Sequence, residues 1–203
     1  MSKLIAFPEM GNYYIPASYL FSRVLNCKIM PRKKITKNTI EIGTKNSPEF
    51  VCTPFKYTLG TMIESLDDGA NVVMQFGGGC RYGYYSELQE QILKDLGYEF
   101  QYVNLISAGK TDIKKIYREL KKLNPKLKMI KSLYHLLVAR NMVKYMDKVD
   151  DYIRHNIGFE ENKGEFERIN QRMLNEFINT KNLFHLRRIY KKYVFYNKHL
   201  FTL

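Results

Sequence analysis

The chain has 203 residues, of which 45% are hydrophobic and 26% charged, and its formal net charge is +13 at neutral pH. This balance is that of a globular protein and excludes a chain that is disordered over most of its length. No stretch approaches about eighteen consecutive apolar residues, so we expect no membrane-spanning helix, and the first residues lack the apolar run of a secretory signal. Three cysteines do not suggest a disulfide framework, so we expect a cytoplasmic protein with reduced thiols.

Strands and helices alternate in the first half of the chain. In chain order we expect a strand over 3–7, a helix over 14–25, a strand over 27–30, a helix from the N-cap Thr36 to about 45, a helix from the N-cap Thr53 to about 68, a strand over 71–76, a helix over 84–96 and a strand over 99–105. This alternation is typical of a mostly parallel sheet, and we predict a Rossmann- or flavodoxin-like α/β fold. Ligands of such sheets bind at the carboxyl ends of the strands.

The second half is predicted to be helical and strongly basic. We expect helices over 112–123, 127–157, 163–179 and 182–198. Residues 1–104 contain 11 Lys and Arg against 10 Asp and Glu, whereas residues 105–203 contain 22 against 10. We therefore divide the chain into an α/β domain over residues 1–108 and a basic helical segment over residues 109–203. The apolar stripes of these helices are wide, and we expect a partner surface to cover them. Without that partner, the stripes would remain exposed or would mediate oligomerisation of the chain.

Two of the cysteines are predicted to lie near the ligand-binding edge of the sheet, each ahead of a helix. Cys52 lies just ahead of one predicted helix, and Cys80 follows a predicted strand and three glycines in the segment FGGGCRYGYY. The positive end of a helix favours the thiolate, which is the form that binds metal, and glycines let a ligand approach the backbone. By placement alone, each is equally well read as a small buried residue. Cys27, at the start of a strand, is read as structural.

Three segments carry a resemblance to a known family. FPEMGNYYIP (7–16), SPEFVCTPFK (47–56) and GGCRYGYY (78–85) resemble the 2-hydroxyacyl-CoA dehydratase D-component family, which includes 2-hydroxyglutaryl-CoA dehydratase and benzoyl-CoA reductase subunits. The similarity is closest to the branch associated with CoA-enzyme activases and covers about residues 4–104. The resemblance implies a [4Fe–4S] cluster held by three cysteines, two of which match Cys52 and Cys80. The third would come from a second α/β domain, and no cysteine follows Cys80 here.

The resemblance also implies a chemistry and a set of partners. An ATP-dependent activator protein would pass a low-potential electron to the cluster, which would reduce a CoA thioester to a ketyl radical. Arg81 and Lys56 would tune the cluster or bind substrate, and Tyr84 and Asn12 would line the same crevice. The chain would then be the N-terminal portion of such a protein, completed by a missing second domain or a partner subunit.

Two other functions fit the sequence. The chain resembles only part of the family's length, so it is also compatible with a non-enzymatic α/β module that serves in assembly. Lysines interleaved with tyrosines are the composition of a nucleic-acid-binding surface. The basic residues recur at helical spacing opposite apolar stripes, however, and a solvated helix face accounts for them, so we do not favour nucleic-acid binding.

Overall fold

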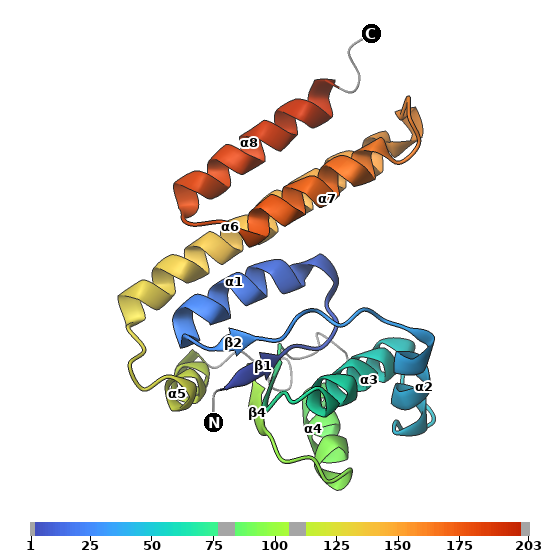
Figure 1. Ribbon diagram of the computed structural model, residues 1–203, viewed down its shortest axis with the longest axis vertical. Helices are drawn as coiled ribbons and strands as arrows, with labels where there is room; N and C mark the ends of the chain where they lie inside the picture. Colours follow the sequence, from blue (N-terminus) through green and yellow to red (C-terminus); the bar gives the residue numbers. More distant parts are fainter. Residues whose placement is uncertain (1–2, 77–83, 106–112, 200–203) are drawn as a thin grey trace. The chain divides into compact units, whose positions relative to one another are not determined.

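The computed structural model describes residues 3–76, 84–105 and 113–199 (Figure 1). The chain forms two compact units, which we call the sheet unit (residues 1–14 and 25–127) and the helical unit (residues 15–24 and 128–203). The division expected between residues 108 and 109 lies outside the described residues. None of the described helices combines the length and the apolar character needed to cross a bilayer.

Parallel strands form the centre of the sheet unit. They are β1 (Leu4–Ala6), β2 (Lys28–Ile29), β3 (Val72–Gln75) and β4 (Gln101–Asn104). In the described part of the chain the strand order is β2-β1-β3-β4, and every pairing is parallel. The chain leaves β1 toward one side of the sheet and later returns to its other side, as in flavodoxin-like sheets. The predicted α/β fold with a parallel sheet and a helical C-terminal part is therefore confirmed.

Both faces of this sheet are apolar, as expected for parallel strands that are covered on each side. The side chains that point to one face are almost fully buried: Ile5, Val72, Met74 and Val103. On the opposite face, Ala6 and Val73 pack into a core with residues of α3 (Thr53–Asp67) and α4 (Tyr85–Asp95). These two helices position the candidate site at the carboxyl edge of the sheet.

Helix α2 (Lys37–Lys45) is fixed against α3 by direct backbone contact. Its N-cap is Thr36, as predicted, and the Thr36 and Thr39 side chains form a capping box. A Cβ on Gly43 would lie 1.8 Å from the carbonyl oxygen of Lys56, and one on Gly60 would lie 2.0 Å from that of Thr39. Only glycine allows this approach, which in turn fixes the loop that leads from α2 to α3.

The amino edge of the sheet is tied to α5 (Ile113–Leu123). The ammonium group of Lys3, just before β1, donates hydrogen bonds to the carbonyl oxygens of Lys122 and Leu123 at 3.1 and 2.9 Å. These carbonyls belong to the last turn of α5, where cations are favoured. Helix α5 therefore ends at the edge opposite to the one where ligands of such sheets bind.

The helical unit has a core of its own. It contains residues 15–24 of α1 (Tyr14–Leu25), with α6 (Met129–Asn156), α7 (Glu165–Ile178) and α8 (Leu183–His199) (Figure 1). Two short 3-10 helices, η1 (Gly11–Tyr13) and η2 (Ile157–Phe159), precede α1 and follow α6. The apolar stripes of these helices, which we expected a partner to cover or solvent to expose, instead meet one another in a core that includes Met142, Phe166, Met173, Phe177 and Leu186. The first turns of α6 differ, since Met129, Ile130 and Leu133 are exposed.

Candidate functional site

The connections of the sheet bring two helix N termini to its carboxyl edge. Helix α3 leads into β3 and α4 follows it, so both helices begin at the end of the sheet where β3 finishes. Cys52 is the N-cap of α3, with an extended backbone (φ −69°, ψ 157°), and Tyr84 is the N-cap of α4. The N-cap predicted at Thr53 is thus wrong by one residue. As the N-cap residue, Cys52 lies at the N-terminal end of α3.

A pocket of about 490 Å³ lies at these two N termini. It is lined by Pro48, Phe50, Val51, Cys52, Phe55, Tyr84, Tyr85 and Leu88. The rings of Phe55 and Tyr85 meet edge to face, with centroids 4.9 Å apart. Cys52 is exposed, so its thiol is accessible from solvent. The described lining contains no Lys, Arg, His, Asp or Glu, and the thiol and two phenols are its main polar groups.

Tyr85 remains a neutral phenol at physiological pH. Burial raises its pKa well above the usual value, the hydrogen bond with Thr58 opposes this, and the neighbouring Cys52 raises it further. A neutral phenol is a hydrogen-bond donor, whereas a phenolate would repel an anionic sulfur. Tyr85 is therefore suited to a place beside a thiolate.

A chain of buried amides joins the end of β3 to the start of α3. Gln75 on β3 donates from Nε2 to Oε1 of Gln89 on α4 at 2.7 Å, and Gln89 donates from Nε2 to Oγ1 of Thr58 on α3 at 2.8 Å. The other end of the Gln75 amide accepts the backbone N–H of Phe76 at 2.9 Å. The side chains of Thr58, Gln75 and Gln89 are all buried. Since buried amides need their partners, this network fixes the exit of β3 relative to the helix that begins at Cys52.

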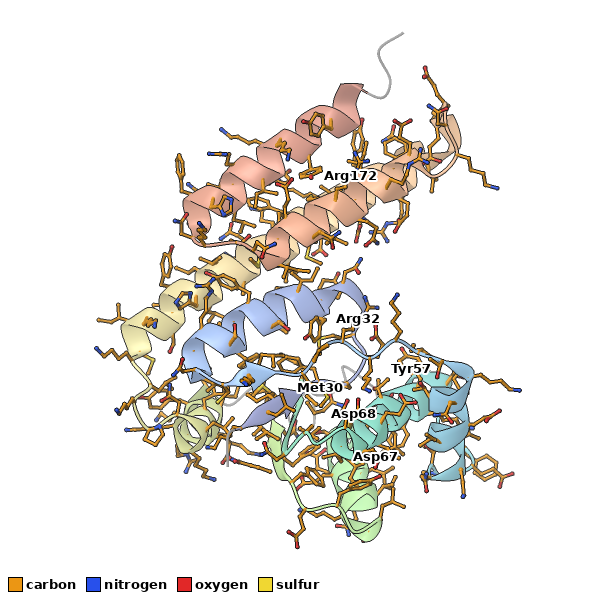
Figure 2. The ribbon with its side chains drawn as sticks, in the orientation of Figure 1. Met30, Arg32, Tyr57, Asp67, Asp68 and Arg172 are labelled. Carbon is orange, nitrogen blue, oxygen red and sulfur yellow. The ribbon has the colours of Figure 1, made fainter. Side chains whose placement is uncertain are left out.

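A second polar cluster occupies the same edge, at the ends of β1 and β2. The carboxylate of Glu9 accepts hydrogen bonds from Arg32 Nε at 3.0 Å and Nη2 at 2.5 Å, and from the backbone N–H of Gly11 at 2.8 Å. The Glu9 side chain is only 6% exposed. Arg32 lies in the segment between β2 and α2 (Figure 2). This ion pair joins the segments that follow β1 and β2.

The predicted site residues fall into three groups. Cys52 and Tyr84 come together at the pocket. Lys56 lies one turn into α3 and is not part of the lining, and Asn12 lies in η1, after β1 and next to the Glu9 cluster. Cys80 and Arg81 lie outside the described residues.

Sequence reasoning missed the Glu9–Arg32 pair and the Gln75–Gln89 contact. The first pair depends on the pairing of β1 with β2, and the second on the packing of α4 against β3. Glu9 stands in the quoted segment FPEMGNYYIP, and a carboxylate directly after the first strand was the available signal.

The third cysteine lies at the opposite edge of the sheet. Cys27 precedes β2, its Sγ contacts the carbonyl oxygen of Leu25 at 3.4 Å, and burial raises its pKa while the nearby Lys3 lowers it. Over residues 3–76, 84–105 and 113–199, no three His, Cys, Asp or Glu side chains are grouped so as to hold a metal ion. The described donor set at the pocket is thus the single thiol of Cys52.

Comparison of this chain with protein-family models, with curated proteins and with solved structures finds no match. The function is therefore argued from the pocket, from the edge of the sheet on which it lies and from the motifs that contain its residues.

Proposed function

We propose that the sheet unit is half of an iron–sulfur site. In this proposal the chain is the N-terminal portion of a 2-hydroxyacyl-CoA dehydratase-like or reductase-like protein, and Cys52 and Cys80 ligate a [4Fe–4S] cluster. The observation that supports it best is the exposed Cys52 thiol at the start of α3, in one pocket with Tyr84. Tyr84 is four residues after Cys80 in the sequence, and four residues span at most about 14 Å.

The donor chemistry fits such a cluster in part. Thiolates are the usual ligands of iron–sulfur clusters, and the N terminus of α3 supplies positive potential beside Cys52. The remaining ligands would come from Cys80 and from a second domain or partner subunit. Cys27 is not proposed as a ligand because it lies at the amino edge of the sheet. When bound, the cluster supplies single electrons at low potential, delivered by an ATP-dependent activator protein.

The chain's own residues would prepare the site for a CoA thioester. The neutral phenol of Tyr85 would donate a hydrogen bond toward a ligating sulfur, and hydrogen bonds to cluster sulfurs set the reduction potential. The apolar walls of the pocket would exclude water from the reacting group. Arg81 and Lys56 would tune the cluster or bind substrate, and Asn12 would line the same crevice, as the resemblance implies. We place the protein in the cytoplasm, where thiols remain reduced.

Iron loading tests this proposal. The protein would be reconstituted anaerobically with ferrous iron and sulfide, and iron and acid-labile sulfide would be measured per chain. We expect Cys52→Ser and Cys80→Ser each to lose most of the bound iron, whereas Cys27→Ser, the matched control, retains it. Cys52 is exposed, so its replacement by serine leaves the fold intact, which circular dichroism verifies. If both variants bind as much iron as the wild type, the ligand assignment is wrong.

The second candidate is a non-enzymatic module that acts in assembly. The exposed apolar side chains of Met129, Ile130 and Leu133 at the start of α6 favour it, because uncovered apolar patches mark sites of protein contact. In this case the wild type would bind no stoichiometric iron under the same reconstitution. An oxygen-sensitive brown protein would instead support the iron–sulfur function.

A further inference from the structure

We infer that the pocket beside Cys52 binds an uncharged, apolar group. This inference rests on the proposed function in one respect, because that group would be the acyl part of the CoA thioester. It names the class of substrate that the site takes: aromatic or branched aliphatic acyl groups, rather than acyl groups that carry a second carboxylate.

The size and walls of the pocket carry the first part of the argument. Its volume of about 490 Å³ lies within the range of small-molecule sites. Its walls are aromatic and aliphatic, and three of the wall side chains are exposed: Phe50 by 96%, Tyr84 by 70% and Leu88 by 37%. Large apolar side chains that remain exposed around one hollow indicate a surface that a ligand covers.

Charge carries the second part. A carboxylate that entered the pocket would leave water without meeting a cation of the described lining, which contains no Lys, Arg or His. Glu49 is exposed between two lining residues, Pro48 and Phe50, and its charge disfavours a second anion at the rim. Burial of an unpaired carboxylate is costly, so the pocket discriminates against one. This local preference runs against the net charge of +13, which attracts anions to the protein as a whole.

The Cys52 thiol provides a direct reporter for the pocket. Iron-free protein would be treated separately with benzyl methanethiosulfonate and with carboxyethyl methanethiosulfonate. In either reaction the thiolate attacks the sulfenyl sulfur, a disulfide forms, and methanesulfinate leaves with the electron pair. Peptide mass spectrometry would give the rate constant at Cys52, with N-acetylcysteine as the free thiol and Cys27 as an internal reference.

We expect the ratio of benzyl to carboxyethyl rates at Cys52 to exceed that of N-acetylcysteine by about tenfold, because a ring that enters the pocket leaves water. Leu88→Asn places an uncharged polar group on the wall and should return the ratio to near the free-thiol value. Leu96→Asn is the matched control, since Leu96 is an exposed leucine at the other end of α4 and is not in the lining. It should leave the ratio unchanged.

A ratio at Cys52 equal to that of N-acetylcysteine overturns the inference, as does a ratio that Leu88→Asn and Leu96→Asn change equally. The two proposals fail separately. Thiol modification is measured without iron, so a protein that binds no cluster still reports the pocket's preference. If the protein binds iron but its ratio at Cys52 equals that of N-acetylcysteine, the apolar pocket is rejected and the cluster assignment stays in place.

Discussion

Replacement of Gln89 by leucine tests the buried amide chain that orders the site. Gln89 is fully buried, accepts a hydrogen bond from Gln75 at 2.7 Å and donates one to Thr58 at 2.8 Å. Leucine has a similar size but cannot accept, so the Gln75 Nε2 group would stay buried without its acceptor. Such a group costs about 1–3 kcal/mol. We expect Gln89→Leu to lower the free energy of unfolding of the sheet unit by about 2 kcal/mol.

The assay is urea unfolding followed by circular dichroism. For a slope of roughly 2 kcal/mol per M, a loss of about 2 kcal/mol moves the midpoint down by about 1 M. Gln91→Leu is the control, because Gln91 is exposed on the same helix and donates a hydrogen bond to Asp95 at 2.7 Å. Its effect should stay within about 0.5 kcal/mol. If Gln89→Leu changes the midpoint no more than Gln91→Leu does, the amide chain does not order the site.

Two further substitutions test how each unit is held together. Gly43→Ala should destabilise the sheet unit by about 1–3 kcal/mol, because the new Cβ would lie 1.8 Å from a carbonyl oxygen of α3. The control Gly158→Ala should be tolerated, because its Cβ would have no atom within 4 Å. Equal unfolding midpoints for the two variants would refute the backbone contact. In the helical unit, burial, with Arg23 and Lys131 nearby, lowers the pKa of His135 below its ordinary 6.5, and Tyr19 Oη lies 3.1 Å from its Nδ1. Because the unfolded chain takes up the proton first, the stability present above about pH 6.5 should fall as the pH drops toward the lower pKa of the folded state. Urea unfolding at about pH 7.5 and 5.5 measures this, and His135→Gln should weaken the pH dependence; an unchanged dependence would mean that another group titrates.

Local signals predicted most of the secondary structure of this protein. The helix expected over 14–25 is found at Tyr14–Leu25, and Thr36 caps α2 through its own side chain and that of Thr39. Gly69 ends the region of α3 with φ +93°, a conformation that glycine adopts without strain. These features depend on residues within one or two turns of each other, and the sequence displays them directly.

Features that depend on how strands pair and how helices pack on them could not be predicted from local signals. Glu9 and Arg32 meet because β1 and β2 are neighbours, and Gln75 meets Gln89 because α4 packs over β3. The predicted site shows the same limit. The helical position of Cys52 was expected from Pro54 and the residues around it, whereas the apolar pocket depends on Phe50 and Leu88, which are far apart in the chain. Neither has a pattern that sets it apart from an ordinary surface or core residue.

Trapping with a monosubstituted arsenical tests most directly whether Cys52 and Cys80 reach the same inorganic centre. Phenylarsenoxide bonds two thiols to one arsenic atom and releases water, so it reports which sulfurs approach each other in the iron-free protein. The account predicts a one-arsenic adduct within a single chain that joins the tryptic peptides of Cys52 and Cys80 and leaves Cys27 free. Arsenic that bridges Cys27 to either partner, or that joins no two cysteines of one chain, would contradict it.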